Sequence, residues 1–288
     1  MRKIFNSILS GIAKNELLWK VSKPFVAIGL TLEKIRTTYL NEEDKKHKKS
    51  LSENSRRVCE SLESSLVVLN GPFKGLKYSS DNSFGSAFYP KLLGVYEKEL
   101  HVVFNQIQNN NYSEIIDVGC AEGYYAVGLA KVYPDATIHA YDISKEAQNL
   151  CTEMATINNV SSQVKVKGLF SSDELGNFNF TGKGLILSDC EGFEKELFNE
   201  SNLANIKNCD LIIEVHDFID IDTSTHLKKL LANTHQIKSI YSVDDIHKSM
   251  EYNIPELDGL SLKERFIILN EGRPSIMEWL ICTPKAMS

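Results

Sequence analysis

The chain has 288 residues, of which 42% are hydrophobic and 24% are charged, and its formal net charge at pH 7 is −6. This length is sufficient for one α/β core and an additional segment. The negative charge argues against general binding to nucleic acid, for which a basic face is expected. The sequence contains no run of about eighteen apolar residues, so it predicts no membrane-spanning helix. Six scattered cysteines without C-x-x-C pairs favour buried thiols in a reducing compartment, and we expect a cytoplasmic protein.

Residues 1 to about 40 are predicted to be helical, because apolar residues recur on one face and basic residues lie elsewhere. Such a basic amphipathic segment can lie on an anionic membrane surface, pack on its own protein, or contact the second subunit of a homodimer. We assign residues 1–70 to an N-terminal helical extension. Residues 71–112 then form a lid or pre-core segment, in which a helix is expected over residues 91–108 and can cover one side of a ligand pocket.

The central motif is a short apolar strand, a glycine-rich turn and a helix, over residues 114–132. The turn contains Gly119 and Gly123, which let the backbone approach a ligand, and the following helix presents unpaired N–H groups at its start. A second strand ends at Asp142, about twenty residues after the turn, where a carboxylate can accept hydrogen bonds from ribose hydroxyls. This succession predicts a nucleoside-binding half of a doubly wound sheet.

The charges in the turn indicate which nucleoside is bound. A dinucleotide site requires G-x-G-x-x-G, whereas here Asp117 lies inside the strand and Glu122 lies in the turn, and both would repel a pyrophosphate. The same charges suit the ammonium and sulfonium of S-adenosylmethionine. The pattern resembles the first motif of the class I S-adenosylmethionine-dependent methyltransferases, D/E-x-G-x-G/A-x-G, and the resemblance extends over about residues 112–284. The residues that we assign to the cofactor site are Asp117, Gly119, Ala121, Glu122, Gly123, Asp142, Ile143, Asp189 and Tyr96.

After Asp142, helical and strand patterns alternate as a parallel sheet requires. The further helices are expected over residues 144–158, 194–198 and 224–233, and the further strands over 164–168, 185–188, 210–215, 237–242 and 277–283. Together these elements predict an α/β fold with a doubly wound, Rossmann-like, seven-stranded and mostly parallel sheet. The resemblance assigns residues 113–288 to the methyltransferase domain, with an insert at residues 243–275 that would shape the substrate site.

Acidic and imidazole side chains follow two of the predicted strands. One strand ends in Ser188-Asp-Cys-Glu-Gly-Phe-Glu194 and the next in Ile213-Glu-Val-His-Asp-Phe218. Ligands of doubly wound sheets lie outside the carboxyl ends of the strands, so these side chains can converge there. The pattern D-x-E-G-x-E followed by E-x-H resembles the FkbM-type branch of methyltransferases, which implies O-methylation of sugars and other small natural products. The candidate catalytic residues are His216, Asp189, Glu214 and Glu191.

The role of these residues has two chemical interpretations and one structural one. A sugar hydroxyl is a poor nucleophile, so a general base or a metal ion should assist it. His216 suits the base, because its ordinary pKa lies near neutral pH, and Glu214 or Asp189 could orient it. Alternatively, Asp189, Glu214 and His216 could bind magnesium or manganese, which accept oxygen-rich sites. In the structural interpretation, His216 only satisfies a hydrogen bond at a strand end.

The predicted function is therefore S-adenosylmethionine-dependent O-methylation of a sugar, glycan precursor or related small molecule. A nicotinamide-dependent dehydrogenase is disfavoured by Ala121 and Glu122 in the turn. An N-methyltransferase is disfavoured because no N/D-P-P-Y tetrad follows the strand that ends at Asp189. A non-catalytic scaffold should have lost Asp117, Asp142 or Asp189, and all three are present.

Overall fold

The computed structural model describes residues 52–80 and 87–285. The chain divides into two compact units, residues 1–56 and 57–288, and the sheet and the candidate site belong to the second unit. The helix expected over residues 1–40 lies outside the described residues, and the domain boundaries near residues 70 and 112 stay predictions. Within the two described ranges, no helix is both long and apolar enough to cross a lipid bilayer.

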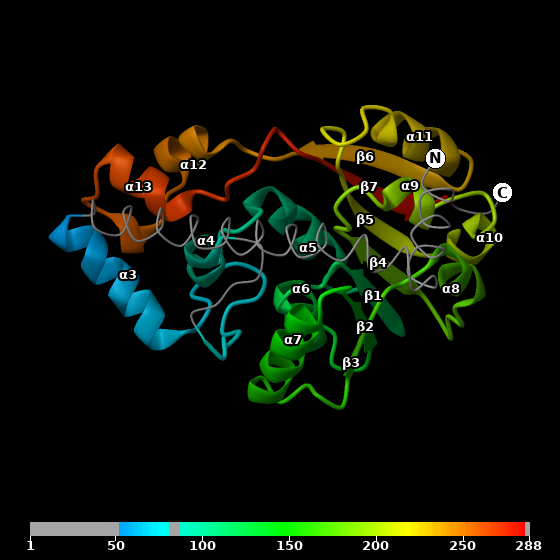
Figure 1. The fold of residues 1–288 in the computed structure, drawn as a ribbon, viewed down its shortest axis with the longest axis horizontal. Helices are drawn as coiled ribbons and strands as arrows, with labels where there is room; N and C mark the ends of the chain where they lie inside the picture. The colour runs from blue at the N-terminus through cyan, green and yellow to red at the C-terminus, as the bar shows by residue number, and fades with distance from the viewer. Residues whose placement is uncertain (1–51, 81–86, 286–288) are drawn as a thin grey trace, which may run out of the picture. The chain divides into compact units, whose positions relative to one another are not determined.

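A seven-stranded sheet with the order β3-β2-β1-β4-β5-β7-β6 forms the centre of the second unit (Figure 1). Its strands are β1 (Glu114–Val118), β2 (Thr137–Tyr141), β3 (Val164–Lys167), β4 (Gly184–Ser188), β5 (Asp210–Val215), β6 (His235–Tyr241) and β7 (Glu278–Pro284). Strands β1 to β5 are parallel, and β7 runs antiparallel to β5 and β6. The predicted fold class is confirmed. The strand order reverses between β1 and β4, where doubly wound sheets bind ligands.

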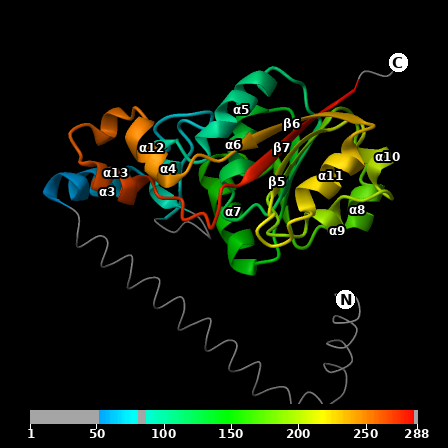
Figure 2. The ribbon, with the colours of Figure 1, turned by 90° about the horizontal axis from the view of Figure 1, so that it is seen from above.

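Helices cover both faces of the sheet (Figure 2). One face carries α5 (His101–Ile107), α6 (Tyr124–Val132) and α7 (Lys145–Ile157), and the other carries α8 (Ser172–Asn177), α9 (Glu194–Leu197), α10 (Leu203–Ile206) and α11 (Thr223–Leu231). Every residue of β1, β4 and β5 is buried, as expected for parallel strands that are covered on both sides. The central strands are therefore rigid, and their carboxyl ends hold side chains in fixed positions.

The helix expected over residues 91–108 is interrupted in the structure. It consists of α4 (Phe88–Leu93), a 3-10 turn η1 (Lys98–Leu100) and α5. Gly94 ends α4 in the left-handed conformation, with φ of 72°, and a Cβ atom there would lie 2.0 Å from the Asn70 carbonyl oxygen. Only glycine is tolerated at so close an approach, so the chain must leave the helix at this position.

The insert at residues 243–275 is itself helical. It contains α12 (Asp245–Glu251), a 3-10 turn η2 (Pro255–Leu257) and α13 (Leu262–Leu269), and α12 packs against α13. Both ribbon views place α12 and α13 beside α4 of the pre-core segment, and α13 contacts α4 directly. The second unit also contains most of α3 (Glu53–Ser65). The insert and the pre-core segment thus meet, although about 150 residues separate them in the sequence.

Candidate active site

The glycine turn after β1 lies directly against the loop after β4. Gly119 has φ of +86° and Gly123 has φ of +99°, a conformation that favours glycine. A Cβ atom on Gly119 would lie only 1.7 Å from the Asp189 carbonyl oxygen. The glycine at this position therefore allows the first cofactor motif and the acidic end of β4 to meet.

Asp142 is fixed at the end of β2 by two backbone groups. Its Oδ2 accepts a hydrogen bond from the Ala121 amide at 3.0 Å, and its Oδ1 accepts one from the Ser144 amide at 2.8 Å. Ser144 in turn caps α7, because its hydroxyl accepts from the Ala147 amide. The neighbouring Ile143 side chain is exposed. The remaining lone pairs of Asp142 are available to ribose hydroxyls, which fits the predicted cofactor site.

Glu122 is buried rather than directed into open solvent. Lys91 of α4 places its Nζ 2.5 Å from Glu122 Oε1, and the Tyr78 hydroxyl donates to the same oxygen at 3.2 Å. The charge of Glu122 therefore has a cationic partner within the protein, and its contact with the cofactor stays a prediction. Sequence analysis missed Lys91, although a single lysine in the apolar segment of α4 is a signal for a buried ion pair.

Asp117 and Tyr96 flank the start of α6. Burial raises the pKa of Asp117 to about 7, against the opposing effect of the nearby Ala126 amide. The Tyr96 ring packs edge-on against Tyr124, with 5.7 Å between ring centroids. Both predicted residues thus lie beside the glycine turn, and a buried carboxyl group with a raised pKa is a common feature of functional sites.

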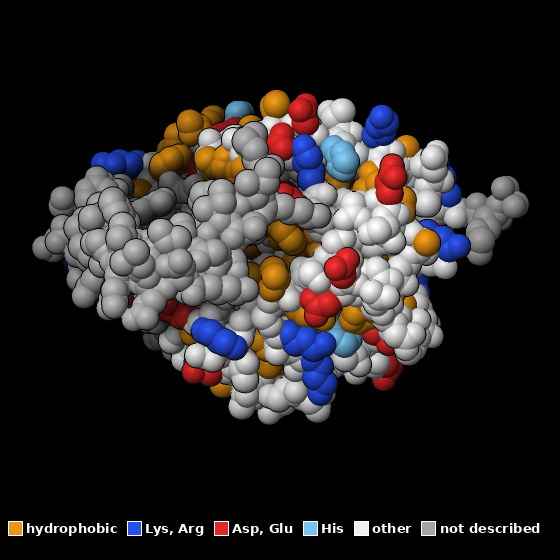
Figure 3. Space-filling model, turned by 45° about the vertical axis from the view of Figure 1, so that its right-hand side comes forward, with side chains coloured by type: hydrophobic (Ala, Val, Ile, Leu, Met, Phe, Trp, Pro, Cys, Tyr) orange, Lys and Arg blue, Asp and Glu red, His pale blue; other side chains and the backbone are white. Residues whose placement is uncertain are grey.

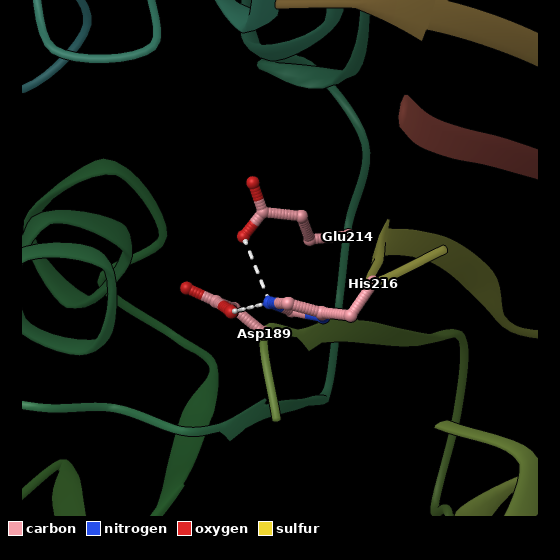
Figure 4. Close-up of side chains that lie close together, drawn as sticks. All are labelled: Asp189, Glu214 and His216. Carbon is pink, nitrogen blue, oxygen red and sulfur yellow. Dashed lines mark ion pairs between the residues drawn. The ribbon is translucent and has the colours of Figure 1, made fainter. Parts of the chain in front are cut away.

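The side chains after β4 and β5 converge on one imidazole ring. His216 Nε2 lies 3.5 Å from Asp189 Oδ1 and 3.8 Å from Glu214 Oε2 (Figure 4). Glu191 Oε2 is also 3.5 Å from Nε2, although the Glu191 side chain is 79% exposed. The four catalytic candidates named from the sequence are therefore brought together, because parallel strands end at the same edge of the sheet.

Glu194 is the residue that orients His216. Its Oε1 lies 2.6 Å from His216 Nδ1 and also accepts from the Gly192 amide at 3.1 Å. Because this oxygen already acts as an acceptor, Nδ1 carries the proton, and neutral His216 presents a lone pair on Nε2. Sequence analysis considered Glu214 or Asp189 for this role. The structure assigns the orienting contact to Glu194, the last acid of the D-x-E-G-x-E motif.

Arg273 of the insert connects three carboxylates around the site. Its guanidinium contacts Glu214 of β5, Glu97 before η1, and Glu271, the last at 3.0 Å. The Arg273 side chain is largely buried rather than exposed in a surface salt bridge. Glu97 adopts a left-handed conformation, with φ of 46°, and also accepts a hydrogen bond from Tyr125. The insert is therefore bound to the site by charge.

The cluster contains more negative than positive charge, and this shifts its protonation equilibria. Burial, followed by the charge of Glu97, raises the pKa of Asp189 to about 7. Burial and the adjacent Asp189 also raise the pKa of Glu214. Burial opposes the charged form of His216, but its hydrogen bond to Glu194 and the nearby carboxylates outweigh that effect and raise its pKa.

On the face drawn in Figure 3, acidic and hydrophobic side chains lie next to each other, with small groups of Lys and Arg between them.

The same residues have the donor set of a divalent-cation site. One ligand atom from each of Asp189, Glu214 and His216 lies within 4.8 Å of the others. Among the described residues, Asp189 Oδ1 is buried and has no hydrogen-bond partner, so a cation bound there would supply one. Two oxygens and one imidazole suit magnesium or manganese.

Comparisons with known proteins agree with the assignment of the glycine turn and the strands around it to a methyltransferase. The profile of the family described as "Methyltransferase small domain" matches residues 99–181, which include the glycine turn and β1 to β3. The matched segment ends before β4, so it does not include Asp189, Glu214 or His216. None of the curated proteins matches the chain at the sequence level.

Two solved structures illustrate the likeness of the fold. The O-methyltransferase TomG of Streptomyces achromogenes, solved with S-adenosylmethionine, is 12% identical, with a TM-score of 0.46 over 68% of this chain and 83% of TomG. The precorrin-6y C5,15-methyltransferase of Geobacter metallireducens is 10% identical, with a TM-score of 0.44 over 69% of this chain and 92% of that protein. At these identities and TM-scores, neither structure indicates the acceptor of this chain.

Proposed function

We propose that this chain, which is a class I S-adenosylmethionine-dependent methyltransferase, methylates a hydroxyl oxygen with His216 as the general base. The observation that carries the proposal is the orientation of the imidazole. His216 is buried, its Nδ1 is held by Glu194, and its Nε2 lies 3.5 Å from both Asp189 Oδ1 and Glu191 Oε2. A base that is held in one tautomer beside the predicted cofactor site is suited to accept a proton from an acceptor hydroxyl.

The reaction is an in-line displacement, in which S-adenosylmethionine supplies an electrophilic methyl group on its sulfonium. The acceptor O–H donates its proton to His216 Nε2 while its oxygen forms the new bond to the methyl carbon. The C–S bond breaks, and its electron pair remains on the sulfur of S-adenosylhomocysteine. Glu194 stabilises the imidazolium that forms. Most of the remaining acceleration would come from holding the two reactants in line.

The finer part of the proposal is the acceptor. The spacing of Asp189, Glu191, Glu194, Glu214 and His216 resembles the FkbM-type branch, which supports a sugar, glycan precursor or related small molecule. Carboxylates near the base can accept hydrogen bonds from neighbouring hydroxyls of such a polyol. The cytoplasmic location, a homodimer and membrane contact by residues 1–40 stay predictions.

A metal-assisted version of the reaction uses the same residues. Asp189, Glu214 and His216 would hold magnesium or manganese, and the cation would lower the pKa of the acceptor hydroxyl. In that version His216 is a ligand and cannot also accept the proton. The unpartnered Asp189 Oδ1 favours this alternative, whereas the contact between Arg273 and Glu214 opposes it by holding a cation there already.

One experiment distinguishes the two versions. Transfer of labelled methyl groups from S-adenosylmethionine to a panel of hydroxyl compounds is measured with EDTA, with magnesium and with manganese. The general-base version predicts turnover in EDTA, with a rate that rises with pH through the raised pKa of His216. Turnover that requires a cation would support the metal-assisted version. Binding of S-adenosylhomocysteine without transfer to any hydroxyl would contradict O-methylation.

A further inference from the structure

Three apolar side chains are exposed immediately after the candidate base. Phe218, Ile219 and Ile221 are 49%, 53% and 77% exposed, respectively, and together we name them the apolar lip. Single exposed apolar residues are ordinary on protein surfaces, but three in four positions of one loop form a patch. Such patches commonly mark binding sites for a ligand or for another protein.

The loop that carries the lip is held in one conformation by its own polar groups. The amides of Ile219 and Asp220 both donate to the His216 carbonyl, at 2.9 and 3.2 Å. Asp217 accepts from the Ser224 amide at 2.8 Å, and Asp220 pairs with Lys195 at 2.8 Å. The acidic residues of the loop therefore stabilise its backbone, and the apolar side chains between them are directed outward.

Two residues of the lip, Phe218 and Ile219, border the reaction site. The Phe218 ring centroid is 5.7 Å from that of His216. Ile219 lies over the turn after β4, because a Cβ atom on Gly192 would be 3.0 Å from Ile219 Cδ1. The preceding residue in that turn is Glu191, which has φ of 51° and approaches His216 Nε2. A molecule whose hydroxyl reaches His216 would therefore extend over both Glu191 and the lip.

The charges around His216 restrict the other end of the acceptor. Asp189, Glu191, Glu194 and Glu214 surround the imidazole, and Arg273, which contacts Glu214, is shared with two further carboxylates. A phosphate or carboxylate next to the reacting hydroxyl would be repelled at such short range. The reacting end should therefore be a neutral or cationic polyol.

Resting on the proposed O-methylation, we infer that the acceptor is an amphipathic hydroxyl compound: an uncharged or cationic sugar-like head joined directly to a hydrocarbon group. The head places its hydroxyl at His216 and its neighbouring hydroxyls near Glu191. The alkyl or aryl group covers Phe218, Ile219 and Ile221, and its transfer out of water contributes to binding. An anionic nucleotide sugar does not fit this description.

The test compares acceptors that differ only in their apolar group. Methyl, hexyl and phenyl glycosides of the same hexoses, kept below their critical micelle concentrations, are assayed with the full chain beside the corresponding nucleotide sugars. Binding of S-adenosylhomocysteine verifies that each variant is folded. The hexyl and phenyl glycosides should be preferred over the methyl glycoside by roughly tenfold in kcat/KM, because a few buried methylenes supply that much.

The double substitution Phe218→Ser and Ile221→Ser should abolish this preference while binding of S-adenosylhomocysteine stays unchanged. Val102→Ser is the control, since Val102 on α5 is exposed to a similar extent, 47%, outside the lip. Equal rates with all three glycosides would overturn the inference and leave O-methylation standing. A second contrary outcome is a doubly substituted variant that keeps its preference for the hexyl and phenyl glycosides but loses a dimer in sedimentation. That result would overturn the inference and assign the lip to a subunit contact. If the protein binds S-adenosylhomocysteine but transfers no methyl group to any hydroxyl compound, this result would contradict the proposed function itself.

Discussion

Beside the glycine turn, Glu122 is paired with Lys91 and Asp142 accepts two backbone N–H groups. At the ends of β4 and β5, by contrast, burial raises the pKa of both Asp189 and Glu214, and three carboxylates share Arg273. In the first region the charges of Glu122 and Asp142 are thus paired, and Asp117 is the exception, because among the described residues neither of its carboxyl oxygens has a hydrogen-bond partner. The second keeps unbalanced charge in a buried place, which costs stability and is typical of a region that acts on a substrate.

The two regions also differ in how the sequence builds them. The cofactor half is formed by β1, β2 and the glycine turn after β1, and the family profile over residues 99–181 includes these elements but ends before β4. The acidic half combines residues from β4, β5, the pre-core segment and the insert. This difference explains why the cofactor could be inferred from a motif, whereas the chemistry depends on contacts between distant segments. Substitutions in the two halves should therefore have different effects.

The largest expected effect on stability is that of Arg273→Met. Glu97 and Glu214 would lose their buried cation, while Glu271 would keep Lys248, and the free energy of unfolding at pH 8 should fall by about 3–5 kcal/mol. At pH 5 the loss should be smaller, because the carboxylates can take up protons instead. Denaturant titration at both pH values measures this. Arg265→Met is the matched control within the insert, since Arg265 donates to the backbone carbonyls of Ser249 and Tyr252 and has no carboxylate partner in the described part of the chain. A loss for Arg273→Met that does not change with pH would contradict the charge account.

Next in size is the effect of Glu194→Gln on turnover. Removing the charge that orients His216 should lower kcat by about 10²-fold and leave the affinity for S-adenosylhomocysteine unchanged. Glu194 raises the pKa of His216, and the base acts only when neutral. The acid limb of the pH–rate profile should therefore move to lower pH in the variant. Glu196→Gln, on the exposed side of α9, is the control, and an unmoved acid limb would reduce Glu194 to a packing role.

In the cofactor half, Asp142→Ala should weaken binding of S-adenosylhomocysteine by roughly 1–3 kcal/mol, because a charged acceptor is lost. Part of this loss arises through the turn, since Asp142 also holds the Ala121 amide. Asp142→Asn keeps one acceptor oxygen and should lose less. Isothermal titration measures both variants. Unchanged binding by the alanine variant would remove Asp142 from the cofactor site.

The smallest expected change is a gain in stability rather than a loss. Asp189→Asn should raise the free energy of unfolding at pH 8 by about 1–2 kcal/mol while reducing methyl transfer. The pKa of Asp189 is raised to about 7 in the folded protein, so its ionisation destabilises the fold as pH rises from about 4 to above 7. The advantage of the variant should therefore fade toward pH 4. Thermal unfolding across this range checks the sign, and a variant less stable at pH 8 would contradict the destabilising ionisation of Asp189.

The sequence predicted those features that depend on neighbouring residues. The strand, turn and helix around Gly119 and the alternation of strands and helices follow from local patterns. The meeting of Asp189, Glu191, Glu214 and His216 could also be predicted, because parallel strands end at one edge.

Contacts between distant segments could not be derived in this way. Lys91 reaches Glu122 only because Gly94 ends α4 where it does, and Arg273 reaches Glu97 and Glu214 only because the insert folds against the pre-core segment. Glu194 lay within a quoted motif, but nothing in that motif indicated which acid would contact Nδ1 of His216. Sequence periodicity locates elements; it does not determine which charged side chains meet between them.

The most direct test of the account is to measure S-adenosylhomocysteine affinity and methyl transfer side by side for His216→Ala. His247→Ala, a histidine exposed on α12 beside Asp244, is the control. The account predicts an unchanged dissociation constant and transfer slowed by about 10²–10⁴-fold for His216→Ala, with neither affected in the control. Normal turnover by the His216→Ala variant would contradict the account, because the reaction would then not need His216 as its general base.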